Sequence, residues 1–262
     1  RSDEKIEVNN KINKNLEEMA QAIFKQWFVD FEFPNEEGKP YKSSGGEMVE
    51  SELGMIPKDW EIKNIEDFCE VCSSKRIFMK DYVKSGIPFY RSKEIIELSN
   101  GNNITTELYI SNKKFNEINS KFGVPKKGDI LLTSVGTLGI SYLVNSDNFY
   151  FKDGNLTWFK SFIGNSNIYI YSFLSSFEGK KAFDKITIGS TQKALTISAL
   201  KKIKLVKPTD KIIDKYTLVC QSLVDKIEFV VSENRNLEKL RDTLLPKLMS
   251  GEIRVPLENN EN

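Results

Sequence analysis

The chain has 262 residues, of which 39% are hydrophobic and 17 are Phe, so it can bury one large core or two small ones. Its formal charge is +1 and it contains no His. The lack of His excludes a Ser-His-Asp triad, a Cys-His centre, a His-ligated metal and an imidazole base. No apolar run approaches the roughly 18 residues of a membrane span, and no signal-peptide pattern is present, so we expect a soluble, cytoplasmic protein without membrane contact.

The charges are unevenly distributed along the chain. Residues 62–208 hold 22 Lys and Arg against 13 Asp and Glu, whereas the remaining residues hold 16 against 24. A basic middle between acidic flanks suits a nucleic-acid-binding module on a scaffold that faces other proteins. The alternative is that the lysines only keep the protein soluble.

Residues 1–33 are predicted to form an N-terminal amphipathic helix that ends before Pro34. Its last turns are rich in aromatic residues, which we expect to pack the helix end onto a neighbouring domain. Residue 1 is Arg and the helix starts in mid-pattern, so we expect a fragment or a processed product. Residues 34–56, rich in Gly, Ser, Pro and Glu, are predicted to be an ordered linker.

Residues 57–208 change to short segments, which predicts a mixed α/β domain. Strands are expected at 60–62, 68–72, 87–93, 149–159 and 205–208, and two strands separated by a Gly-rich loop are expected within 128–144. One helix is expected over 167–184 and a loop at 189–193. Cys69 and Cys72 form a C-x-x-C, but in a strand they point to opposite faces, and Cys220 lies on a distant helix. We therefore predict structural cysteines and neither a metal site nor a cofactor.

Residues 209–252 are predicted to be one long coiled-coil helix, followed by a tail at 253–262. Apolar residues recur every three or four positions, and Asn234 and Arg241 interrupt them. A buried Asn in such a seam fixes the register at a cost in stability.

The N-terminal helix repeats this pattern, with Asn13, Leu16 and Glu17 matching Asn234, Leu237 and Glu238. Any two amphipathic helices share such spacing, but the common Asn-x-Asn-Leu-Glu argues against coincidence. The predicted helix-pairing residues are Ile6, Asn13, Leu16, Ile23, Ile227, Val230, Asn234, Leu237 and Leu244.

The order of the motifs resembles the specificity subunit of type I restriction-modification systems over almost the whole chain. The motifs are Trp27-Phe28-Val29-Asp30-Phe31, Ile56-Pro57-x-x-Trp60, Gly128-Asp129-Ile130-Leu131 with Gly136-Thr137-x-Gly139, the 189–208 loop and strand, and the closing helix. The resemblance implies an α+β fold in which one mixed target-recognition domain is bracketed by long coiled-coil helices. It also implies half of a subunit that normally carries two such domains.

The resemblance further implies a non-catalytic subunit that directs a DNA methyltransferase subunit and a restriction subunit to one half of a bipartite site in double-stranded DNA. The sequence agrees, because it contains neither a phosphate-binding Gly-x-x-x-x-Gly-Lys-Ser/Thr loop nor an Asn-Pro-Pro motif. A homodimer through the long helices would read a symmetric target.

Loops with mixed polar and basic residues are the expected DNA-reading elements, since base edges are read by donors and acceptors and phosphates mainly fix register. Arg91 and Gln192 are predicted to contact bases, and the lysines phosphates. The full set is Ser74, Lys75, Arg76, Tyr90, Arg91, Lys93, Ser134, Thr137, Thr191, Gln192 and Lys193.

Two other classes of protein remain open at this point. A non-catalytic coiled-coil scaffold with a basic middle would bind nucleic acid without sequence preference. A nuclease or methyltransferase in its own right requires a carboxylate or Asn-Pro-Pro constellation that we do not find.

Overall fold

The computed structural model describes residues 2–146 and 148–253, so the predicted tail beyond residue 253 lies outside the described residues. The chain divides into two units. The helix-pair unit contains residues 2–18 and 223–253, and the mixed unit contains residues 19–222. Helices α1 (Ser2–Phe28) and α7 (Asp210–Met249) each contribute residues to both units.

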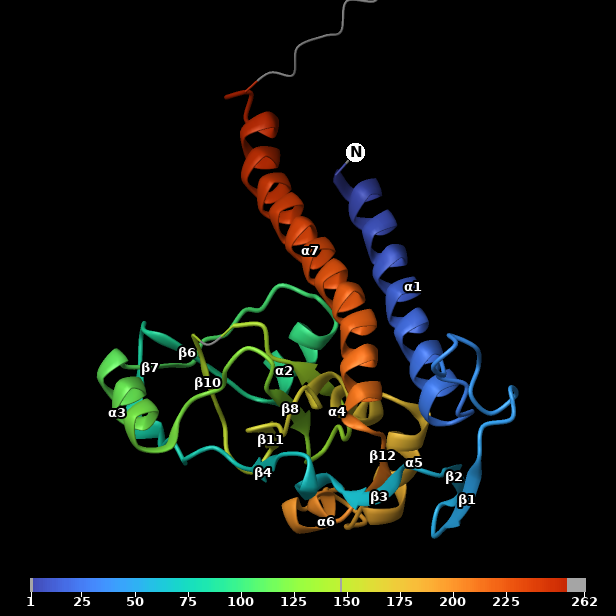
Figure 1. Cartoon of the computed structure of the whole chain (residues 1–262). Helices are drawn as coiled ribbons and strands as arrows, with labels where there is room; N and C mark the ends of the chain where they lie inside the picture. The colour runs from blue at the N-terminus through green and yellow to red at the C-terminus, as the bar shows by residue number, and fades with distance from the viewer. Residues whose placement is uncertain (1, 147, 254–262) are drawn as a thin grey trace, which may run out of the picture. The chain divides into compact units, whose positions relative to one another are not determined.

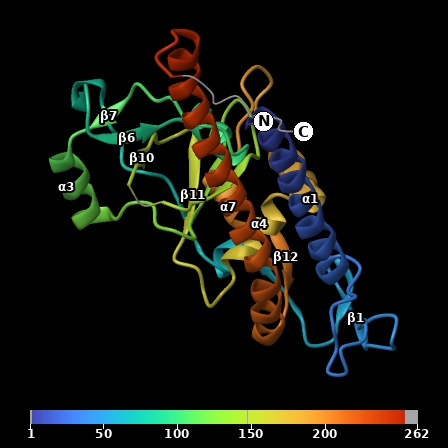
Figure 2. The same cartoon turned by 90° about the horizontal axis from the view of Figure 1, so that it is seen from above.

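In the helix-pair unit, α1 and α7 lie side by side and run in opposite directions (Figures 1 and 2). Asn9 is only 1% exposed, and its Nδ2 donates to Asn234 Oδ1 at 2.8 Å and to Glu233 Oε2 at 2.7 Å. Asn234 Nδ2 donates in turn to Asn10 Oδ1 at 2.9 Å. Asn234 is therefore buried, at 6% exposure, and its amide bonds to Asn9 and Asn10, which the heptad pattern does not place on the seam.

Most predicted helix-pairing residues are at least half-buried, namely Ile6, Asn13, Leu16, Ile23, Ile227, Val230, Asn234 and Leu237. The prediction for Leu244 is wrong within this chain, because its side chain is 41% exposed. The reason is the register of the pair. Arg241 already contacts Asp3 at 2.8 Å, near the first described residue of α1.

The mixed unit contains all other helices and strands of the described chain. Its helices are α2 (Ser92–Ser99), α3 (Asn112–Phe122), α4 (Asn167–Leu174), α5 (Phe177–Ile186) and α6 (Ile197–Lys201), with short 3-10 turns η1 (Ile65–Asp67) and η2 (Met79–Asp81). Its strands are β1 (Met48–Ser51), β2 (Gly54–Pro57), β3 (Glu61–Asn64), β4 (Glu70–Cys72), β5 (Tyr82–Val83), β6 (Ile87–Tyr90), β7 (Tyr109–Ile110), β8 (Ile130–Thr133), β9 (Ser141–Leu143), β10 (Tyr150–Phe151), β11 (Leu156–Lys160) and β12 (Lys204–Lys207).

Two four-stranded sheets and two strand pairs organise this unit. One sheet has the antiparallel order β4-β11-β8-β9, in which Trp158 of β11 lies between Leu131 of β8 and Cys72 of β4. The other has the order β10-β6-β7-β5, with β10 parallel to β6. β1 pairs with β2, and β3 pairs with β12. The expected mixed fold is confirmed.

The aromatic end of α1 is packed into the mixed unit, as the sequence predicts. Phe28 lies 4.7 Å from both Tyr169 and Tyr216, and 5.8 Å from Trp60, measured between ring centroids. The Tyr216 hydroxyl donates to Ser172 Oγ at 2.7 Å, so the buried phenol is also satisfied.

Five predicted elements differ from the structure. The strand expected at 87–93 ends at Tyr90, since α2 begins at Ser92. Helix α1 ends at Phe28 rather than near residue 33, because the chain turns at Phe31, whose φ is +58°. The linker contains the β1–β2 hairpin, and the segment at 149–159 is two strands that belong to different sheets. The helix expected over 167–184 is two helices, since Ser176 caps α5 through Gly179 N at 3.0 Å.

Candidate nucleic-acid interface

Residues 152–155 form a four-residue turn between β10 and β11, which we call the central turn (Figure 1). Three of the predicted loops form hydrogen bonds to it. Gly154 has a φ of +79°, a conformation that glycine adopts without steric cost. Asn155 O accepts from Ser134 N at 2.9 Å and from Ser92 Oγ at 3.5 Å. The loops after β8 and β6 are therefore held by one backbone carbonyl.

The first half of the central turn holds the other predicted loops. Lys152 N donates to Tyr90 O at 2.8 Å. The Arg76 guanidinium donates from Nε to Asp153 Oδ2 at 3.0 Å. Through these bonds, two segments that are distant from the turn in the sequence, one of them by 77 residues, lie next to it.

The fourth predicted loop, residues 189–193, is attached to the loop after β8. Gly136 N donates to Lys193 O at 3.0 Å, and Leu195 N donates to Ser134 O at 2.8 Å. Three of the four loops that the sequence predicts to read DNA thus bond to the central turn, and the fourth is attached to it indirectly, through the loop after β8.

Seven of the predicted DNA-binding residues are exposed: Lys75, Arg76, Lys93, Thr137, Thr191, Gln192 and Lys193. Within the described residues, the ammonium groups of Lys75, Lys93, Lys152 and Lys193 form no ion pair with a carboxylate. Positive charges without a paired carboxylate, on the central turn and on three of the loops, favour contact with an anionic polymer.

Ser74 and Ser134 do not present their hydroxyl groups at the surface, and their prediction as exposed polar contacts is wrong. Ser74 Oγ is buried and donates to Phe151 O at 2.8 Å. Ser134 is 3% exposed, and its Oγ lies 2.6 Å from Thr157 Oγ1. Both hydroxyls satisfy buried partners, so they shape the loops rather than face a ligand.

Arg91 is bound to a buried carboxylate instead of pointing freely outward. Its Nη2 donates to Glu94 Oε1 at 2.8 Å, and its backbone N donates to Glu94 Oε2 at 2.8 Å at the start of α2. The Glu94 side chain is fully buried. Burial raises the pKa of Glu94, but the hydrogen bonds from Arg91 outweigh it and leave the pKa lowered.

Tyr90, the remaining candidate, is half-buried and stacks on Phe149, with ring centroids 4.8 Å apart. Nearby, burial raises the pKa of the Tyr150 hydroxyl, which accepts a 2.7 Å hydrogen bond from Lys75 N.

Burial also raises the pKa of Cys72 to about 11 and that of Cys69 to about 12. Both thiols are protonated at neutral pH and are poor nucleophiles.

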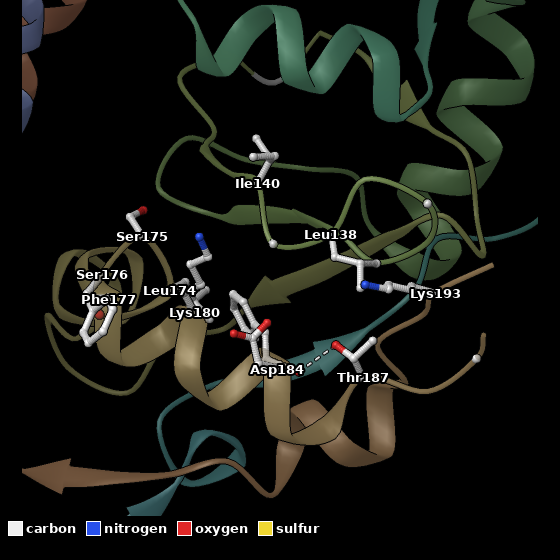
Figure 3. Close-up of a pocket in the computed structure, with 14 residues that line it drawn as sticks. Leu138, Ile140, Leu174, Ser175, Ser176, Phe177, Lys180, Asp184, Thr187 and Lys193 are labelled. Carbon is white, nitrogen blue, oxygen red and sulfur yellow. Dashed lines mark hydrogen bonds between the residues drawn. The ribbon is translucent and has the colours of Figure 1, made fainter. Parts of the chain in front are cut away.

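A cavity of about 780 Å³ adjoins two of the loops (Figure 3). The loop residues that line it are Gly136, Leu138, Gly139, Ile140, Thr187, Gly189 and Lys193, and α4 and α5 with the residues between them contribute the rest. In Figure 3 the Lys180 side chain extends from α5 toward Ile140, and the Lys193 side chain extends toward Leu138. The loops therefore border a hollow surface with two amino groups.

The sequence prediction missed the central turn itself and the cavity wall on α5. Asp153-Gly154 is a frequent turn dipeptide and could have divided the segment at 149–159 into two strands. Lys180 carries no comparable signal, because a lysine on an amphipathic helix is usually solvated.

Known proteins are similar to this chain over most of its length. The family described as "Type I restriction modification DNA specificity domain" matches residues 57–228. The MjaIX type I restriction enzyme specificity subunit of Methanocaldococcus jannaschii is 30% identical, over 97% of this chain and 56% of that protein. The HindI specificity subunit of Haemophilus influenzae is 24% identical, over 96% of this chain and 64% of that protein. The chain thus spans little more than half the length of these relatives.

Solved structures show the same fold at low sequence identity. The type I restriction-modification S subunit from M. genitalium has a TM-score of 0.55 at 15% identity, covering 94% of this chain and 55% of that chain. The HsdS subunit from Thermoanaerobacter tengcongensis has a TM-score of 0.51 at 13% identity, covering 94% and 54%. Among the described residues, no helix is both long and apolar enough to cross a membrane. On the match that spans residues 57–228, the chain belongs to the family of type I restriction-modification DNA specificity domains.

Proposed function

We propose that this chain is a non-catalytic specificity subunit that recognises one half of a bipartite site in double-stranded DNA. The observation that carries the proposal is the convergence of three loops on the central turn, with the fourth attached to the loop after β8, and with exposed Lys, Thr and Gln side chains. Membership of a DNA specificity family supports the same function.

Within this surface, the side chains divide by chemistry. The Gln192 amide can donate to and accept from adenine in the major groove, and Thr137 and Thr191 can bond to several bases. Lys75, Lys93 and Lys193 carry compact positive charges that suit phosphates and fix the register of the protein on the duplex.

The partners that we propose are a DNA methyltransferase subunit and, through it, a restriction subunit, in the cytoplasm. We also propose a homodimer through the long helices. Leu240, Leu244 and Leu248 on α7 are 55%, 41% and 37% exposed, respectively, and provide apolar surface for a second chain. Two copies would read a symmetric target with a gap set by helix length.

The experiment that tests this function is selection of binding sites from random duplex DNA at two salt concentrations, with and without the methyltransferase subunit. A short gapped motif is the expected result, and an inverted repeat of it supports the homodimer. Retention of random DNA, with affinity falling steeply as salt rises, would leave only phosphate contacts and favour a scaffold with a non-specific basic domain.

A matched pair of variants sharpens the test. Gln192→Ala is expected to relax the preference at one position of the motif. Gln26→Ala changes an exposed Gln on α1, outside the four loops, and is expected to leave every position unchanged.

A further inference from the structure

The side chain of Asn155 is free although its backbone is firmly held. Its carbonyl accepts the bonds from Ser134 N and Ser92 Oγ, and the next residue, Leu156, begins β11, where it pairs with Thr133 of β8. Gly154 on the other side adopts the left-handed conformation that closes the turn. The position of Asn155 is therefore set by a sheet rather than by a loose loop.

The amide of Asn155 makes no hydrogen bond to any described residue. The residue is half-buried, and its amide atoms are not among the buried, unpaired polar atoms of the described chain, so they remain in contact with solvent. Two neighbouring polar residues of the same type, in contrast, use their amides to hold the fold. Asn165 donates to Asp214 Oδ1 at 2.8 Å, and Asn167 donates to Gly128 O at 3.2 Å.

We propose that Asn155 is a specificity-determining residue that reads adenine in the major groove from the middle of the DNA-binding surface. This inference rests on the proposed function. An Asn amide pairs with the N6 donor and N7 acceptor of adenine at once, which a Lys or a hydroxyl does not do. Because the backbone of Asn155 is already fixed, little conformational freedom is lost when the amide binds a base.

The rest of the central turn complements this role. Lys152 is exposed and forms no ion pair within the described chain, so its charge can contact a phosphate beside the base that Asn155 reads. Asp153 would repel DNA, but the ion pair with Arg76 compensates its charge. One short turn thus supplies a base contact and a phosphate contact, and its one carboxylate does not repel the DNA because its charge is compensated.

The test is the same binding-site selection, performed with the full chain bound to the methyltransferase subunit, on Asn155→Ala and Asn155→Asp. Asn155→Ala is expected to keep the gapped motif but to lose adenine preference at one position by roughly tenfold or more. Asn155→Asp presents only acceptors and is expected to shift that position toward cytosine, whose N4 is a donor. It also keeps the shape of the side chain if the Ala variant fails to fold.

Controls separate this inference from the proposed function. Asn116→Ala alters an exposed Asn on α3 and is expected to leave every position of the motif unchanged. Lys152→Ala should weaken binding to all sequences alike and lower the salt slope by about 1. A wild-type chain that selects no motif contradicts the proposed function. A wild-type motif that both Asn155 variants retain in full overturns only the role of Asn155.

Discussion

Replacing Arg91 with alanine distinguishes a residue that reads DNA from one that stabilises the start of α2. The sequence predicts base contact by Arg91, whereas the structure binds its guanidinium to the fully buried carboxylate of Glu94 at 2.8 Å. If the structural role dominates, Arg91→Ala lowers the free energy of unfolding before it affects any preference for a base.

The size of this loss follows from the contacts. A hydrogen bond to a charged group contributes about 1.5–3 kcal/mol, and breaking a fully buried ion pair costs about 3–5 kcal/mol. The Arg91 side chain is 41% exposed, so water screens the pair and can reach Glu94 once the guanidinium is gone. The bond from Arg91 N to Glu94 Oε2 also survives the substitution. We therefore expect the free energy of unfolding to fall by about 2 kcal/mol, which lies between the values for exposed and for fully buried ion pairs.

The loss should depend on pH. In the wild type the pKa of Glu94 is lowered, so the pair stabilises the fold above the ordinary Glu pKa of about 4.3, and this contribution disappears as the pH falls through the lowered value. In Arg91→Ala only the backbone hydrogen bonds oppose the effect of burial, so the pKa of Glu94 is higher than in the wild type. The carboxyl then becomes neutral more easily, and the difference from the wild type should shrink as the solution is acidified.

The assay is urea unfolding of Arg91→Ala, Glu94→Gln and the double variant at neutral pH and about one unit below the ordinary Glu pKa of about 4.3. Lys93→Ala is an exposed neighbouring control, expected within about 0.5 kcal/mol of the wild type. The double variant should be less destabilised than the sum of the single ones. A wild-type unfolding free energy for Arg91→Ala, together with a relaxed preference at one base position, would refute the structural role.

Three further predictions test other parts of the structure. Asn9→Ala leaves the 6%-exposed Asn234 without its donor and should cost about 1–3 kcal/mol in urea unfolding, and an unchanged midpoint would contradict the buried amide pair. Gly179→Ala would place a Cβ 2.2 Å from Phe173 O, so we expect a loss of at least about 1–3 kcal/mol and a lower melting temperature; wild-type melting would contradict this close approach. Lys193→Ala should weaken binding to cognate and random duplexes equally and lower the salt slope by about 1, and a loss confined to one sequence would instead assign a base contact.

Local patterns in the sequence determined the long helix and the central strands of the mixed unit. The heptad of α7 depends only on residues three and four apart, so it predicts the helix and the burial of Asn234 without a partner in view. The Gly-rich segment between β8 and β9 is likewise predicted from neighbouring residues alone. Tertiary structure decided which side chains remain free. Ser74 bonds to Phe151, 77 residues away, and Asn9 bonds to Asn234, 225 residues away. A pattern of neighbouring residues cannot predict contacts between residues so far apart in the sequence.

The candidate interface shows the same division. The types of residue that suit DNA, and the loops that carry them, can be predicted from the sequence, because turns and polar clusters are local signals. The convergence of the loops on residues 152–155 depends on the pairing of β11 with β8 and of β10 with β6. Whether Arg91 faces DNA or Glu94 depends on how deeply α2 is buried. Burial and pairing are properties of the whole fold, and they separate the side chains that stabilise the protein from those that are free to bind.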